Sequence, residues 1–164
     1  MMPSLTNPRQ VVFVTARAER LVMGRRIEKD SITMTTWHMP ISLKPRNYAV
    51  AIANSDFSNN LIKESNVFCV NFIAKTFEKY AQRIDKIDGE NFNRYEALGL
   101  AMEECNAIDC GRIKDVLGFA ECEVIAKHDF SDHSLYIGKV VKSELKKVGK
   151  RLFQIDERTF TTTD

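Results

Sequence analysis

The order of its secondary-structure signals is the feature that most constrains how this 164-residue chain can fold. Segments rich in β-branched and aromatic residues, which favour strands, follow one another with only short helical stretches between them. They lie at residues 11–16, 31–37, 48–53, 67–72, 119–127, 134–145 and 152–155. Strands and helices do not alternate, and the sequence contains neither Gly-x-Gly-x-x-Gly nor a Gly-Lys-Ser/Thr loop, which argues against a parallel nucleotide-binding sheet. A mainly β fold is predicted: an antiparallel barrel of six or seven strands with short peripheral helices.

Three short helices are predicted between these strands. Ser58 is a suitable N-cap for the first, which would turn Leu61 and Ile62 inward. The second spans residues 77–84 and the third, longer one spans 95–105, with a turn at 88–91 between them. The last two long strands are expected to form a hairpin joined by residues 129–133. The chain shows no repeat and no linker, so residues 1–164 are interpreted as one domain.

Composition excludes several classes of function. Apolar residues make up 44% of the chain and charged residues 28%, as in ordinary soluble proteins, and the net charge of +2 gives no reason to expect nucleic acid. No apolar run approaches the roughly 20 residues of a membrane helix. Because Met1 to Gln10 lack the pattern of a secretion signal, a cytoplasmic location is predicted, with no membrane partner.

The four cysteines fall in different contexts. Cys69 and Cys122 lie inside strand-like runs and are predicted to be buried thiols. Cys105 and Cys110 are five residues apart, but no second pair and no nearby histidine completes a zinc site. No metal site is therefore predicted.

Polar side chains gather where the first helix begins, and they are Asn54, Ser55, Ser58 and Asn59. Unpaired N–H groups and the helix dipole make such an end a potential anion site. The same residues can equally serve as ordinary helix caps, and one residue can do both. Lys63 and Lys75 are the candidate cations for a phosphate group there.

Four segments, in order, resemble the flavin reductase-like family, which has the FMN-binding split-barrel fold. They are Pro8 to Thr15, similar to the family's "P-x-x-V-x-x-V-T"; Thr33 to Ser42, similar to "mt-x-s-W-x-x-P-v-S"; Ser58 to Asn71, similar to "S-x-x-l-I-x-e-s-x-x-F-x-V-N"; and Asp132 to Val140, similar to "G-D-H-x-l-f-v-G-x-V". The tryptophan in the second segment is nearest to the flavoredoxin-like subgroup. Three departures concern the substrate side: Arg46 replaces a second proline, Ser131 replaces a glycine, and Arg94 is a displaced counterpart of a family lysine.

The resemblance implies an FMN-binding oxidoreductase, in which NADH or NADPH reduces the flavin and the electrons pass to free flavin, ferric iron or a protein. A flavoredoxin-like electron carrier without its own nicotinamide site is an alternative. So is a split barrel that binds another ligand, such as haem, or none. The family builds its site between two chains, which implies a homodimer.

The resemblance also implies a set of flavin-contacting residues. The segment 33–37 would run along the isoalloxazine ring and the ribityl chain, although a plain strand with threonines facing solvent fits its composition too. Lys75 is the preferred phosphate cation because it follows Asn71 in the flavin-lining region. The lone tryptophan, Trp37, could equally lie in the core or an interface. The complete set is Thr33, Met34, Thr35, Thr36, Trp37, Ser42, Asn54, Ser55, Ser58, Asn59, Asn71 and Lys75.

His133 and Asp132 are the candidate catalytic residues, because the resemblance places this Asp-His pair near the nicotinamide and the flavin. Asp132 would orient the imidazole of His133 and raise its pKa, so that the ring could stabilise negative charge on reduced flavin. The alternative is an ordinary exposed hairpin turn. No nucleophile is required, because hydride transfer uses the chemistry of the flavin itself.

Overall fold

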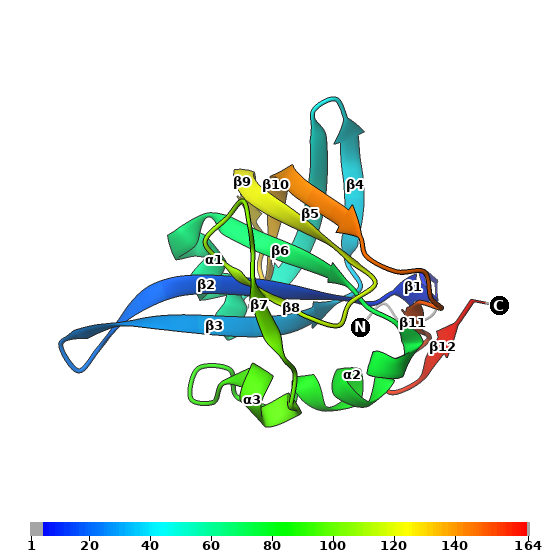
Figure 1. Cartoon of the computed structure of the whole chain (residues 1–164), viewed down its shortest axis with the longest axis horizontal. Coiled ribbons are helices and arrows are strands. Elements are labelled where there is room, and N and C mark those ends of the chain that lie inside the picture. Colours follow the sequence, from blue (N-terminus) through cyan, green and yellow to red (C-terminus); the bar gives the residue numbers. More distant parts are fainter. Residues whose placement is uncertain (1–4, 164) are drawn as a thin grey trace.

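A seven-stranded antiparallel sheet forms the body of the computed structural model, which describes residues 5–163 (Figure 1). Its strands run in the order β3-β2-β6-β9-β10-β5-β4. Their bounds are β2 Val12–Val22, β3 Arg25–Thr35, β4 His38–Leu43, β5 Arg46–Ala53, β6 Val67–Phe72, β9 Gly118–Asp129 and β10 His133–Leu145. The two outermost strands, β3 and β4, leave the sheet with two open edges.

Short elements complete the fold. Two small sheets, β1-β11-β12 and β7-β8, comprise β1 Arg9–Gln10, β11 Leu152–Gln154, β12 Phe160–Thr162, β7 Met102–Glu104 and β8 Gly111–Ile113. The helical elements are α1 Phe57–Ser65, the 3-10 turn η1 Lys75–Phe77, α2 Glu78–Ile84 and α3 Arg94–Leu98. In Figure 1, α2 and α3 lie beneath β3, and the β2–β3 and β4–β5 hairpins project from the body.

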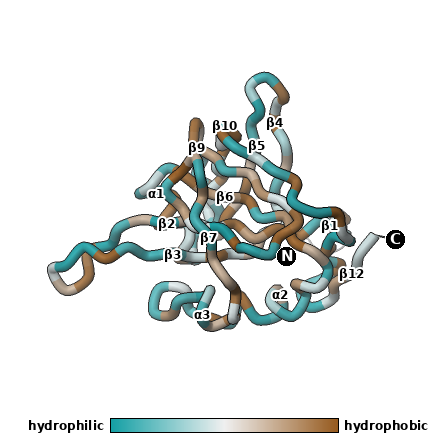
Figure 2. The backbone as a smooth tube through the Cα atoms, viewed as in Figure 1, coloured by the Kyte–Doolittle hydropathy of each residue, from teal (hydrophilic) through white to brown (hydrophobic). Residues whose placement is uncertain are grey.

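Alternating side chains of the strands build separate apolar cores. The first fills the barrel interior and contains Val14, Val50, Phe68 and Tyr136, with Leu61 and Ile62 of α1 closing it. The second packs the opposite face of β2 and β3 against the helices. A third, smaller core lies under the β7–β8 hairpin. Figure 2 shows hydrophobic residues concentrated where the strands cross, whereas the β2–β3 hairpin is largely hydrophilic except at its tip.

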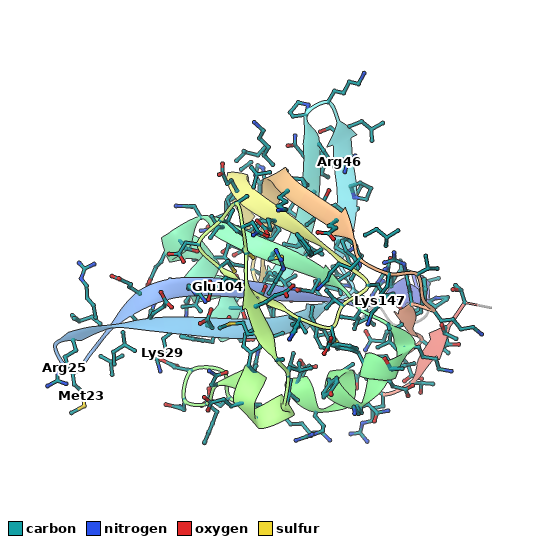
Figure 3. The ribbon with its side chains drawn as sticks, in the orientation of Figure 1. Met23, Arg25, Lys29, Arg46, Glu104 and Lys147 are labelled. Carbon is teal, nitrogen blue, oxygen red and sulfur yellow. The ribbon has the colours of Figure 1, made fainter. Side chains whose placement is uncertain are left out.

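The hairpin tips expose apolar and basic side chains. Met23 at the β2–β3 turn is 98% exposed and has a φ of 50°, and Gly24 beside it has a φ of 78°. Figure 3 shows Met23 and Arg25 at this tip and Arg46 on the β4–β5 hairpin. The left-handed pair Met23-Gly24 permits the tight reversal between two long strands.

The predicted barrel, the C-terminal hairpin and the inward-facing helix α1 are confirmed, with seven strands in the main sheet. Two predictions about helices are wrong. The N-cap of α1 is Asp56, whose carboxylate accepts from the N–H of Ser58 at 2.8 Å, so Ser58 lies inside the first turn. The helix expected over 95–105 ends at Leu98 because Gly99 caps it with a φ of 71°, and the following residues form β7.

In the described part of the chain, 5–163, no helix has the length and apolar character needed to cross a membrane. The cysteines predicted to be buried, Cys69 and Cys122, are both fully buried.

Candidate functional site

A pocket of about 680 Å³ opens beside the edge strand β3, where the barrel is split. Three parts of the fold form its walls: β3 around Thr33–Thr35, the end of β5 with the start of α1, and the loop that precedes α3. His133 at the start of β10 completes the lining. The volume falls within the roughly 300–1,000 Å³ that small-molecule and cofactor sites occupy.

The open edge of β3 supplies backbone groups to this pocket. The C=O of Ile32 points away from β2, because it accepts a hydrogen bond from Nη1 of Arg94 at 2.6 Å. Backbone groups alternate sides along an antiparallel strand, so the N–H and C=O of Met34 also point outward. Two hydrogen bonds connect residues 35–37 with β5: Thr35 Oγ1 donates to Ala51 O at 3.1 Å, and Ala51 N donates to Trp37 O at 2.9 Å. The pocket therefore offers both donors and acceptors from the main chain.

The threonine hydroxyls of the segment 33–36 already have partners within the protein. Thr33 Oγ1 donates to Asp56 at 3.0 Å, and Thr35 Oγ1, besides its bond to Ala51, accepts from the N–H of Trp37 at 3.0 Å. Thr36 Oγ1 accepts from Arg9 Nε at 3.3 Å. These hydroxyls therefore already have partners within the protein, and the backbone of this segment presents further polar groups to the pocket.

The chain's own carboxylate occupies the helix end that was expected to receive phosphate. Asp56 caps α1 through one carboxylate oxygen, and the other accepts from Thr33 and from Arg94 Nη1 at 3.1 Å. Asp56 and Arg94 have side chains only 13% and 7% exposed, so their ion pair is buried. A capping carboxylate at this position neutralises the partial positive charge of the helix end.

The loop over residues 85–93 wraps around Arg94. Nε of Arg94 donates to Ile87 O at 3.0 Å, and a Cβ added at Gly89 would lie 3.1 Å from both Cζ and Nε of Arg94. A side chain at residue 89 would therefore crowd the guanidinium, and glycine leaves room for the loop to pass it. The pKa of Asp85, in the same loop, is raised mainly because its carboxyl group is buried.

Lys86 and Arg94 are the cations that line the pocket. Lys75, the cation preferred from the sequence, is exposed at the start of η1 and does not line it. Its position after Asn71 suggested a place in the lining, but no residue of 73–77 lines the pocket. The displaced basic residue Arg94 was visible in the sequence, whereas its approach to β3 depends on the tertiary fold.

Two aromatic rings meet where β10 begins. The rings of Trp37 and His133 lie 4.5 Å apart between centroids and are tilted by 34°. His133 Nδ1 is 2.9 Å from Asp132 Oδ1, and this hydrogen bond is the main cause that lowers the pKa of Asp132. The predicted Asp-His pair is therefore formed, with His133 in the pocket lining and Asp132 exposed.

The other predicted residues separate into two groups. Ser55 lines the pocket, as does Asn60, which the sequence analysis missed. By contrast, three of the predicted side chains are fully buried. Ser58 bonds to Ser31, and Asn59 bonds to Tyr136 and to the end of β5. Asn71 bonds to β2 and β8. These three side chains hold elements together and do not line the pocket.

Asn54 and Ser42 also serve local structure. Asn54 Nδ2 donates to Phe130 O at 3.3 Å, and its Oδ1 accepts from Ser134 Oγ at 2.8 Å, which ties the end of β5 to the β9–β10 turn. Ser42 Oγ donates to Pro45 O at 2.6 Å inside the β4–β5 hairpin. Ser42 lies in a separate groove, away from the pocket beside β3.

Comparison with known proteins decides the family. The flavin reductase like domain matches residues 4–162 of this sequence. The chain belongs to the flavin reductase-like family. An uncharacterized protein of Archaeoglobus fulgidus is 28% identical over 115 residues, which cover 70% of this chain and 65% of that relative. The chain thus spans less than two thirds of that relative's length.

Solved structures of low sequence identity share the fold of this flavin reductase-like chain. An FMN-binding protein of Thermus thermophilus, solved with bound 1-cyclohex-2-enone, superposes with a TM-score of 0.81 at 17% identity. The superposed region covers 96% of this chain and 88% of the Thermus thermophilus protein. Flavoredoxin of Desulfovibrio vulgaris (Miyazaki F) superposes with a TM-score of 0.82 at 15% identity, over 100% of this chain and 94% of the other. The predicted FMN-binding split barrel is confirmed as the fold.

Proposed function

We propose that this flavin reductase-like protein is an FMN-dependent oxidoreductase that accepts electrons from NADH or NADPH and delivers them to free flavin, ferric iron or a protein. The observation that carries the proposal is the pocket beside the open edge of β3, with His133 in its lining. The family and its fold favour a flavin as the ligand of such a pocket. FMN would supply the hydride-accepting chemistry, while the protein supplies position and electrostatics.

The pocket fits the chemical groups of FMN. A flavin ring carries carbonyl and N–H groups along its edge, which match the outward-facing N–H and C=O of Met34 on β3. The methyl groups of Ala51 and Ala53 offer apolar surface beside them. Ser55, Asn60 and Lys86 are the groups that would hold the phosphate, because Asp56 already occupies the helix cap.

Arg94 holds the walls of this pocket in place. It binds the Ile32 carbonyl of β3, the Ile87 carbonyl of the loop and the Asp56 carboxylate of α1. One buried guanidinium therefore joins all three walls. Its planar fork suits several acceptors at once, which a lysine ammonium would satisfy less well.

The imidazole of His133 acts next to the reacting ring. Its Nδ1 is held by Asp132, which leaves Nε2 as the nitrogen that can meet a ligand. A protonated His133 would stabilise negative charge on the reduced cofactor. Trp37 packs against this imidazole and fixes its orientation.

Anaerobic titration of the purified, FMN-loaded protein tests the proposal. The visible spectrum is recorded, and NADH or NADPH is then added without oxygen. A yellow protein that bleaches supports the reductase. A yellow protein that stays coloured with both nucleotides contradicts the nicotinamide step and indicates a flavoredoxin-like carrier, and failure to take up FMN contradicts the flavin site.

The resident cofactor is FMN rather than FAD. Heat release followed by chromatography gives the identity and stoichiometry of the cofactor, with one FMN per chain expected. Recovery of FAD alone at unit stoichiometry would contradict this choice.

A homodimer is the proposed assembly. An apolar groove of about 620 Å³ lies between the β4–β5 hairpin and β10, and Leu43 and Leu145 along it are 81% and 64% exposed. A second copy would cover these side chains, and an obligate pairing of this kind removes more than about 2,000 Å² from water. Light scattering that shows a monomer at micromolar concentration would contradict the dimer.

A further inference from the structure

Cys105 and Cys110 face each other across the β7–β8 hairpin, and neither residue lines the pocket. The strand register pairs Glu104 with Gly111, so the next opposed pair is Cys105 with Cys110. The N–H of Cys105 donates to the carbonyl of Cys110 at 2.9 Å. Opposed residues joined in this way have Cα atoms about 5.5 Å apart, which lies in the range that a disulfide spans.

A third cysteine, Cys69, lies close to these two. Cys69 of β6 is fully buried in the same small core as Cys110, and Cys105 packs against that core. Cys110 is also fully buried, whereas Cys105 is only partly buried at the end of β7. Of these three sulfurs, Cys105 is therefore the one that a dissolved reagent reaches first.

The surroundings of Cys105 favour its thiolate. The neighbouring thiols of Cys110 and then Cys69 lower the pKa of Cys105 to about 5, and the Arg112 guanidinium acts in the same direction, whereas burial and Glu121 oppose it. The pKa of Cys110 is raised, mainly by the neighbouring Cys105 and to a smaller extent by burial. Partly exposed thiolates near a cation are the reactive kind of cysteine.

The hairpin is anchored so that the two cysteines stay opposed. Glu121 of β9, fully buried, accepts from the N–H groups of Asn106 and Ala107 at 3.0 and 2.7 Å and from Arg112 at 2.5 Å. Arg17 of β2 binds Glu104 at 2.6 Å on the other side, and Figure 3 shows Glu104 lying over β2.

We propose that Cys105 and Cys110 form a peroxide-sensitive dithiol, in which Cys105 reacts first and Cys110 closes a disulfide across the hairpin. The Cys105 thiolate attacks hydrogen peroxide, which breaks the O–O bond and leaves a sulfenic acid and hydroxide. The Cys110 sulfur then attacks the sulfenic sulfur, an S–S bond forms, and the sulfenic oxygen leaves as water with the Cys110 proton. The hydroxide becomes water by taking up the proton that Cys105 released on ionising. Two thiols thus lose two electrons in total, and one peroxide becomes two molecules of water.

Disulfide mapping after addition of hydrogen peroxide to the folded protein tests the proposal. Remaining thiols are alkylated under denaturing conditions, and peptides are analysed by mass spectrometry. The expected product is one Cys105–Cys110 disulfide, 2 Da lighter, with Cys69 and Cys122 still alkylated. Reduction by excess thiol should restore the original mass.

Single variants assign the roles. In Cys110→Ser, the sulfenic acid at Cys105 should persist and be trapped by dimedone, whereas Cys105→Ser should give no adduct at residue 110. Cys122→Ala, which removes a buried thiol inside the barrel, is the matched control and should form the disulfide as the wild type does. A Cys69–Cys105 disulfide, equal oxidation of Cys122, or no loss of mass would each overturn the proposal.

The pH dependence of alkylation gives an independent readout without any variant. A thiol with a pKa of about 5 remains mostly thiolate at pH 5.5, so the rate at Cys105 should fall less than about twofold between pH 7.5 and 5.5. An ordinary thiol with a pKa near 8.5 would slow about ninetyfold over the same interval. A fall of that size at Cys105 contradicts the reactive-thiolate step.

Discussion

Replacement of Arg94 by methionine should destabilise the protein strongly, because this guanidinium is buried and joins three elements. Its side chain is 7% exposed and that of its partner Asp56 is 13% exposed. Arg94→Met leaves the Asp56 carboxylate without its cation and removes the donors to Ile32 O and Ile87 O. Loss of one partner from a buried ion pair costs about 3–5 kcal/mol. At about 2–4 °C per kcal/mol for a chain of this size, the melting temperature should fall by about 6–20 °C.

Urea and thermal unfolding followed by circular dichroism measure this loss. Arg26→Met is the matched control: its ion pair with Glu19 spans 3.3 Å, but the side chains are 81% and 60% exposed. Exposed pairs contribute about 0–1 kcal/mol, so this control should unfold almost as the wild type does.

A double-mutant cycle separates the ion pair from the two carbonyl bonds. Asp56→Asn retains an oxygen that can cap α1, and the double variant Arg94→Met/Asp56→Asn removes both charges. The double variant should recover part of the loss, because no charge then remains buried without a partner. If Arg94→Met lies within about 1 kcal/mol of the wild type, or the double variant is less stable than the sum of the single changes, the reasoning is refuted.

Three further predictions concern the core, pH and flavin reduction. Gly138→Ala should lower stability by about 1–3 kcal/mol in urea unfolding, because the new Cβ would lie 2.8 Å from the Phe68 ring in the core. Burial lowers the pKa of His38, so the unfolded chain takes up a proton at this histidine before the folded protein does. The free energy of unfolding should therefore decline as the pH falls below about 6.5. His38→Gln should flatten this decline in thermal scans, whereas a change at the exposed His128 should not. His133→Ala should slow flavin reduction by NADH at least about tenfold in stopped flow with little change in FMN affinity, and an unchanged rate would make the histidine a simple turn residue.

The fold was largely accessible from the sequence because strand patterns are local. The segments 48–53 and 67–72 lie inside β5 and β6 almost to the residue, and the long C-terminal hairpin was recognised from its two arms. Strands that carry charges on an exposed face were underestimated. β2 continues to Val22 because its outer half pairs with β3 beyond the core, where no apolar run indicates a strand.

Short elements defined by tertiary contacts were missed. Residues 95–105 contain enough helix-forming side chains to suggest one helix, but Gly99 ends α3, and Met102–Glu104 pair with β8 instead. The competing signal, a single glycine, was present in the sequence. Its meaning depended on β8, the strand that pairs with Met102–Glu104, which no local pattern reveals.

The sequence indicated some of the residues that line the pocket, and those that do not line it share one physical cause. Residue type indicates that an oxygen or an amide is available, but it does not reveal which partner has already taken it. Asn59 and Asn71 have the polar groups that a flavin needs, yet Tyr136, β2 and β8 already engage them inside the fold. Where the fold leaves polar groups open, along the edge of β3, they belong to the backbone, which every residue carries and no sequence motif marks. A split barrel can therefore hold a polar ligand through main-chain groups at its open edge while its polar side chains keep the walls of the site in place.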